Sequence, residues 1–368
     1  MIKPRKLFFY NDDRKEHVKA LDGLRGIAVL MVLLSHTSNN FIYFHPSLAF
    51  NGIGKGGVYL FFVLSAYLLD RQIAMAMMNG SADAFFWKRY FIRRLLRIFP
   101  VLIVSLFLYW SLTGMGITNV ILNARDMFMH MSLLKGNGVF WSIPVEFKYY
   151  ILSPFILLIC HFWMKWDLRY ILIFFLLISA TSLGLDYFIH FNKINTFKFL
   201  TVFLAGTYLA IFDLKINETP FISKWGTMFG IAGLIALFNC LLMNPNYVGN
   251  WLGVDNSNNG RKILILYVIL CGIMLFAALH SRGIFRQFLE MKFLRFIGII
   301  SFSLYLFHMP VIYFMNMGWI KIPWLLQIYF FFGMTLFLST ISFLLVERPV
   351  SLIRISKKVK IESSIDLP

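Results

Sequence analysis

An arginine and a histidine share one face of the first long apolar segment, LDGLRGIAVLMVLLSH. Arg25 lies near the start of this segment, and His36 follows eleven residues later. Eleven residues make almost three turns of an α-helix, so both side chains point the same way, with roughly 16 Å of rise between them. An arginine can bind an anion, and a histidine can move a proton during catalysis. The spacing therefore predicts a path with a cationic entrance and a reactive end.

A glutamate lies at a matching depth in a later segment of opposite direction. Glu146 is about 7 residues into its segment from one side, and His36 is about 12 residues into its own from the other. A carboxylate beside an imidazole can orient the ring and stabilise its protonated form, so the two residues could form an acid/base pair. They could equally form a buried pair that only tethers two helices.

A cluster of basic residues enters the third apolar segment, in WKRYFIRRLLRIFP. Arg94 and Arg97 are three residues apart and share a helix face, and Arg93 is adjacent. Guanidinium groups suit bidentate contacts with phosphate, so this cluster could capture a phosphate-rich ligand. It could also serve only to hold the helix end at anionic lipid headgroups, the interpretation that composition alone favours.

Two more ionisable residues lie near the C-terminus. His308 is two residues before Pro310 in SFSLYLFHMP, where its ring could satisfy backbone that the proline frees. That explanation is favoured over a second one, in which His308 contacts an acceptor substrate. Glu347 ends the last apolar segment, in VERP, where a carboxylate could position the arginines.

The composition indicates a membrane protein whose helices must position these residues. Of 368 residues, 59% are hydrophobic and only 14% are charged, and the mean hydropathy is +0.72. A soluble domain does not reach such values, and ionisable residues inside membrane helices usually face a cavity or one another. Runs of about 17 to 25 apolar residues predict an all-α transmembrane bundle of about ten spans. The predicted spans are 24–44, 57–74, 96–114, 139–163, 168–185, 197–213, 225–243, 262–280, 293–317 and 322–347.

The distribution of positive charge predicts the orientation. Lysine and arginine are more frequent at both ends of the chain and in the even-numbered loops than in the odd-numbered loops, so both termini are expected in the cytoplasm. This role accounts for the net charge of +18, and no nucleic-acid partner is expected. We predict a basic cytoplasmic leader over 1–23, a membrane domain over 24–347 and a short cytoplasmic tail over 348–368. The first span is too long for a cleaved signal and is expected to stay as an anchor.

The cysteines indicate neither a metal site nor a disulfide. Cys160, Cys240 and Cys271 all lie in apolar segments and have no paired spacing. We therefore expect no bound metal. The region 117–134 is expected to be an amphipathic surface helix or a re-entrant segment, and the Asn- and Gly-rich loop 244–261 is expected outside the cell.

Taken together, six segments resemble the acyltransferase-3 family, membrane enzymes that modify bacterial surface polysaccharides. They keep the family's order over residues 21–349 and are LDGLRGIAVLMVLLSH, GKGGVYLFFVLSAYLL, RRLLRIFP, WSIPVEFKYY, FLRFIGIISFSLYLFHMPV and VERP. Ala66 departs from the family's usual glycine. Because about twenty residues follow VERP, the esterase-like domain that some members carry is not expected.

The resemblance implies an O-acyltransferase of the bacterial inner membrane, most often an O-acetyltransferase. Its donor would be cytosolic acyl-CoA, a substrate and not a permanently bound cofactor. Its acceptor would be a sugar hydroxyl of an envelope polysaccharide or of a lipid-linked precursor, and its other partners would be membrane lipids. The implied catalytic residues are His36, Arg25 and Glu146, the implied acyl-CoA-binding residues are Arg94, Arg97 and Arg93, and the acceptor-binding or supporting residues are Trp141, Ser142, His308 and Glu347.

The expected mechanism has His36 accept the proton of the attacking hydroxyl while Glu146 stabilises the imidazolium. Direct transfer and a covalent acyl-histidine are both compatible with these residues. The main alternative is a secondary transporter or lipid flippase in which His36 and Glu146 form a proton relay. A scaffold subunit is a third interpretation, but it leaves the buried charges without a role.

Overall fold

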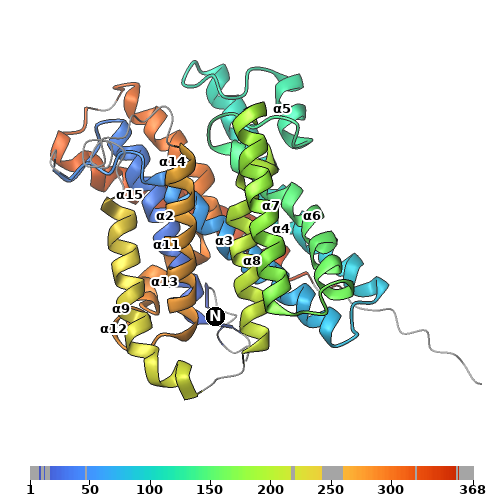
Figure 1. Ribbon diagram of the computed structural model, residues 1–368. Helices are drawn as coiled ribbons and strands as arrows, with labels where there is room; N and C mark the ends of the chain where they lie inside the picture. The colour runs from blue at the N-terminus through green and yellow to red at the C-terminus, as the bar shows by residue number, and fades with distance from the viewer. Residues whose placement is uncertain are drawn as a thin grey trace, which may run out of the picture.

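Long apolar helices make up most of the chain. The computed structural model describes residues 8–9, 12, 17–45, 48–216, 220–242, 260–319, 321–353 and 355. Within these residues there are helices and no strands, and the helices pack side by side as a bundle (Figure 1). Nine of the described helices are long and apolar enough to cross a membrane, and a bent pair brings the number to ten. The predicted all-α membrane bundle of about ten spans is confirmed.

The helices match the predicted spans in order. The long ones are α2 (Lys19–Asn39), α3 (Gly54–Met78), α4 (Ala84–Gly114), α6 (Ser142–Phe162), α7 (Leu168–Ile189), α8 (Leu200–Lys215), α9 (Pro220–Leu242), α11 (Gly260–His280), α14 (Ser301–Asn316) and α15 (Trp324–Ser342). The short ones are α5 (Ala124–Met131), η1 (Gly138–Trp141), η2 (Thr196–Phe199), α12 (Ile284–Leu289), α13 (Lys292–Ile299), the π-helical η3 (Phe343–Glu347) and α16 (Arg348–Ser351). The largest departure is α4, which begins twelve residues before its predicted span because the arginine cluster is helical too.

Helix α2 lies inside the bundle. It packs against α3, α11, α12, α13 and α14. Of the residues in its most apolar 18-residue stretch, 72% are buried inside the protein. Glycines allow this close approach, since a Cβ at Gly23 would lie 1.9 Å from the carbonyl oxygen of Leu289. A Cβ at Gly298 would lie 1.7 Å from the carbonyl oxygen of Asp22. Small residues that let backbones touch are typical of helix interfaces in membranes.

The ninth predicted span, 293–317, is broken. Helices α13 and α14 meet at Ile300 with a bend of 77°, which starts a new helix at Ser301. Pro310 lies within α14 and cannot donate to the carbonyl of Leu306, four residues earlier. Tyr109 of α4 donates to that carbonyl instead, at 3.2 Å. The prediction that His308 satisfies the backbone freed by Pro310 is therefore wrong.

Helix α5 lies at one end of the bundle, outside the candidate spans (Figure 1). It falls inside the region expected to hold a surface helix or a re-entrant segment, and Asp126 and His130 in it are buried. The loop expected at 244–261 lies outside the described residues, apart from its last two residues, which begin α11. The orientation of the termini and the boundaries of leader, membrane domain and tail stay predictions.

Candidate active site

A polar cavity gathers the predicted acyl-CoA-binding arginines. It has a volume of about 300 Å³ and is partly open, and Arg93, Arg94 and Arg97 of α4 line it together with Arg25 of α2 and Glu347 of η3. We call it the arginine cavity. Three of these arginines come from two turns of one helix, and the bundle adds the fourth from a distant part of the sequence. The predicted cluster is thus a wall of a cavity and not only a helix end.

Two contacts show how this wall is held. The guanidinium of Arg94 lies over the ring of Tyr150, 5.7 Å from its centroid, and its Nε has no hydrogen-bond partner among the described residues. Glu347 accepts a hydrogen bond from the hydroxyl of Ser303 in α14. The cavity therefore has a spare hydrogen-bond donor, Nε of Arg94, on an arginine-rich wall, which suits an anionic ligand.

A second cavity adjoins the first. It is narrow, with a volume of about 60 Å³, and its lining includes Arg25 and Arg97 again, so these two side chains border both cavities. Glu146 also lines it, and we call it the glutamate cavity. Most of its other lining residues are apolar. A ligand anchored in the arginine cavity could extend an uncharged arm into this space.

Besides the two arginines, the polar groups of the glutamate cavity come from three helices. Glu146 of α6 accepts hydrogen bonds from Ser65 of α3, at 2.5 Å, and from Tyr150. Ser301 lies at the start of α14, and its buried hydroxyl has no described partner. Sequence reasoning missed Ser65, Tyr150 and Ser301, because nothing in their local sequence marks them as cavity residues.

His36 lines neither of these two cavities and is paired with another histidine. Its Nδ1 is 3.2 Å from Nε2 of His308 and 3.0 Å from Sδ of Met309. The centroids of the two imidazole rings are 4.9 Å apart. Within the described chain no hydrogen bond joins His36 to Glu146, so their predicted direct pairing is wrong. The reason is packing, since the ring of His36 meets α14, whereas the carboxylate of Glu146 meets Ser65 of α3. Counting residues from the ends of two segments gives positions along the helices, but it does not reveal which side chains meet.

A tyrosine links the glutamate cavity to the histidines. Tyr305 lines the cavity and lies one helical turn before His308, with ring centroids 6.0 Å apart. Ser142 donates a hydrogen bond to the Tyr305 hydroxyl at 3.0 Å, and Glu146 follows Ser142 by one turn. Of the predicted supporting residues, Ser142 and His308 are thus in the polar path, whereas Trp141 packs against the ring of Phe199.

The family assignment agrees with this arrangement. The pattern of a family described as an acyltransferase domain matches residues 18–344. The chain belongs to the acyltransferase-3 family. It therefore carries an acyltransferase domain built of many apolar helices, and Arg25, His36 and Glu146 all lie within the matched residues.

Curated relatives are also acyltransferases. The protein is similar to O-acetyltransferase OatA of Staphylococcus aureus strains NCTC 8325 and COL, at 26% identity over 368 residues in both. The alignments cover 91% of this acyltransferase and 57% of each relative, so the chain spans little more than half the length of these relatives. No solved structure matches it significantly.

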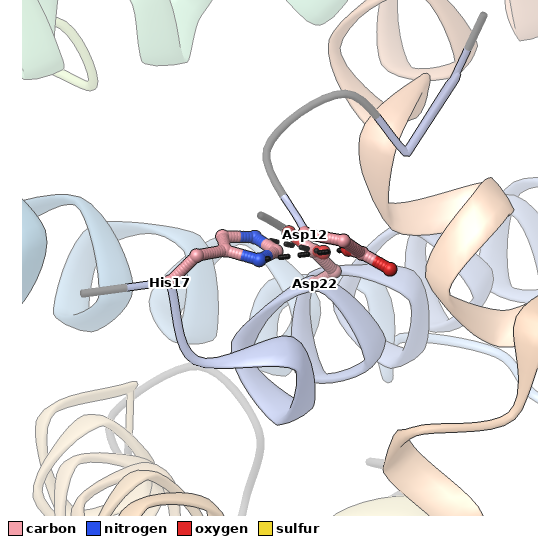
Figure 2. Close-up of side chains that lie close together, drawn as sticks. All are labelled: Asp12, His17 and Asp22. Carbon is pink, nitrogen blue, oxygen red and sulfur yellow. Dashed lines mark ion pairs between the residues drawn. The ribbon is translucent and has the colours of Figure 1, made fainter. Parts of the chain in front are cut away.

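One group near the N-terminus of the acyltransferase has ligand types that metals use. Figure 2 shows the ring of His17 facing both Asp12 and Asp22, with its Nε2 3.1 Å from a carboxylate oxygen of Asp22. The buried guanidinium of Arg295 in α13 pairs with both carboxylates. Burial raises the pKa of Asp12, but Arg295 beside it outweighs this effect and lowers the pKa below its ordinary value. We interpret the group as an ion-pair network that ties the start of the chain to α13.

Lys148, an ionisable residue of α6 two positions after Glu146, lines neither cavity. Its side chain is exposed and donates to the carbonyl of Ile194 at 3.3 Å. The bundle therefore brings Arg25, Glu146, the α4 arginines and Glu347 around two adjoining cavities, and it places His36 with His308 next to them.

Proposed function

We propose that this acyltransferase moves an acetyl group from acyl-CoA to a sugar hydroxyl of a bacterial envelope polysaccharide or of its lipid-linked precursor. The observation that carries the proposal is that the arginine cavity and the glutamate cavity share Arg25 and Arg97, and that Tyr305 of the glutamate cavity lies beside His308, the partner of His36. This arrangement offers anion-binding groups at one end and a proton acceptor at the other. Those are the two requirements of a transferase that uses a phosphorylated thioester donor.

The donor's phosphates would bind in the arginine cavity, to Arg94, Arg97 and Arg93. The pantetheine arm of CoA is uncharged and carries two amides, which suits the largely apolar glutamate cavity with its few polar groups. Extended like about five peptide residues, such an arm spans roughly 17 Å. That length is similar to the rise of roughly 16 Å between Arg25 and His36 on α2.

His36 would act as the general base. It takes the proton of the sugar hydroxyl as the hydroxyl oxygen attacks the thioester carbonyl carbon, and the new C–O bond forms. The C–S bond then breaks, and the proton passes to the sulfur, which leaves as the free thiol of CoA. Glu146 is held by Ser65 and Tyr150 in the cavity of the arm, so we assign it to the donor, as an acceptor for an amide N–H.

The expected compartment is the bacterial inner membrane, with both termini in the cytoplasm. The arginine cavity is lined by residues from the N-terminal region and from η3 and α16 at the end of the last span. With cytoplasmic termini it opens to the cytosol, where acyl-CoA is made. Acceptor sugars would reach His36 from the other side.

The test is a mass spectrum of the surface polysaccharide from cells that express the wild-type chain or His36→Ala at equal membrane abundance. An increment of one acetyl mass per modified sugar, lost in the variant, is the expected result. Purified protein with acyl-CoA should show a rate about 10² to 10⁴ times lower for the variant, the usual contribution of a general base. Full transfer by His36→Ala would contradict the role of His36, and movement of an unmodified sugar would favour a transporter or flippase.

A further inference from the structure

We propose that His308 fixes the tautomer of His36, so that Nε2 of His36 is the nitrogen that accepts the proton. This inference rests on the proposed role of His36 as the base. It makes His308 a positioning residue, because it acts through His36 and not on the substrates.

The proton on His308 can be located from its contacts. Its Nδ1 lies 3.2 Å from the carbonyl oxygen of Leu304, and a carbonyl oxygen can only accept, so Nδ1 carries the hydrogen. His308 is fully buried, and no carboxylate contacts it among the described residues, so a charged ring there would have no counter-ion. A neutral imidazole has one N–H. Nε2 of His308 is therefore an acceptor.

The proton on His36 follows from that result. Its Nδ1 faces Nε2 of His308 at 3.2 Å and Sδ of Met309 at 3.0 Å. A thioether sulfur can also only accept, so both neighbours require Nδ1 of His36 to donate. Nε2 of His36 then keeps its lone pair, and no described residue hydrogen-bonds to it. The half-buried ring can use that nitrogen for a bound hydroxyl.

The two helices hold the rings in this register. Asn40, directly after α2, donates to the backbone carbonyl of His36 at 2.8 Å, and Asn316 of α14 donates to the side-chain oxygen of Asn40 at 3.0 Å. Since Tyr109 already satisfies the carbonyl that Pro310 frees, His308 is not needed to repair the helix. Its remaining function is the contact with His36.

A hydrogen bond to the distal nitrogen of a catalytic histidine is a known way to select its reactive tautomer. In hydrolase triads a carboxylate has this role and also stabilises the imidazolium. A neutral imidazole can orient His36 but adds no charge. We therefore expect loss of His308 to slow the chemical step and to leave donor binding intact.

The experiment compares His308→Gln with His308→Leu in the purified full chain, with acetyl-CoA as donor. A glutamine carbonyl oxygen can occupy the place of Nε2 and accept from His36, whereas leucine has a similar volume and no acceptor. We expect kcat to fall by about 100-fold for His308→Leu and by less than about 10-fold for His308→Gln, with KM for acetyl-CoA unchanged in both. His161→Gln is the control, because His161 makes its contact with Trp166 away from this site.

The outcomes separate this inference from the proposed function. Equal kcat for the leucine and glutamine variants, at any level, would overturn the positioning role. Loss of acetyl-CoA binding in both would also overturn it and would make His308 a structural residue. In the same assay, an active His36→Ala would refute the base, whereas an inactive His36→Ala beside an unaffected His308→Leu would refute only the inference about His308.

Discussion

Helices α2 and α7 have similar lengths but different surroundings. They contain 21 and 22 residues, and both are apolar enough to cross a membrane. Yet 72% of the residues in the most apolar 18-residue stretch of α2 are buried inside the protein, against 17% for the same measure in α7. Arg25 and His36 lie on α2, whereas the ionisable residues of α7, Arg169 and Asp186, lie in its first and last turns. Charged groups deep in a span are tolerated where protein and cavities surround them, because lipid offers no partner.

The glycines of the two helices repeat this contrast. Gly23 of α2 touches the backbone of Leu289, whereas a Cβ at Gly184 of α7 would meet nothing within 4 Å. In α2, glycine is a requirement of packing. In α7, the same residue has no packing role in the described structure.

The largest expected effect is on stability. Gly23→Ala should lower the free energy of unfolding by about 2–4 kcal/mol, because the new methyl group must push a backbone carbonyl away. Gly184→Ala should leave it unchanged or raise it by up to about 1 kcal/mol, because alanine favours helix. Unfolding of both purified variants in the same detergent measures the difference. Equal shifts would show that α2 is not packed as described.

A charge reversal tests the same contrast within α4. Arg94 lines the arginine cavity, whereas Arg89 is exposed and lines neither cavity. Arg94→Glu should raise KM for acyl-CoA by at least about 10-fold, since it replaces a phosphate partner with a repelling charge. Arg89→Glu should change KM by less than about 2-fold. If both variants behave alike, the cluster serves topology and not donor binding.

The smallest effect concerns α5, outside the spans. His130 accepts a hydrogen bond from the backbone N–H of Asn137 at 3.0 Å, which requires a neutral ring, and burial lowers its pKa below the ordinary value. A lowered histidine pKa stabilises the fold above the unfolded-state pKa of about 6.5, and this contribution is lost as the pH falls below that value. Amide exchange around Asn137, corrected for intrinsic rates, should therefore be faster at pH 5 than at pH 7.

Two controls accompany this measurement. Exchange in α7 should not change over the same range, and His130→Gln should remove the pH dependence around Asn137. The nearby Asp126 does not confuse the result. Burial raises its pKa, but Lys135 and the N–H of Leu122 outweigh this and lower it, so Asp126 begins to protonate only in more acidic solution.

The predictions succeeded where the chain itself carries the signal. The ten apolar runs became the expected helices, and the arginines of α4 came together with Arg25 and Glu347 around one cavity. The pairing of His36 with Glu146 failed. A depth count describes position along a helix, but it does not describe which neighbour the side chain meets.

The amino-acid sequence on its own therefore determined the membrane class, the number of spans and the residue types that could do chemistry. Each of these follows from length, apolar periodicity and motif order, which are properties of the linear chain. Tertiary structure alone decided that His308 is the partner of His36, that Arg25 and Arg97 border two cavities and that the ninth span breaks at Ile300. Each of these features depends on the rotation and tilt of one helix against another. Rotation and tilt are set by contacts between segments hundreds of residues apart, such as α2 with α13 and α14.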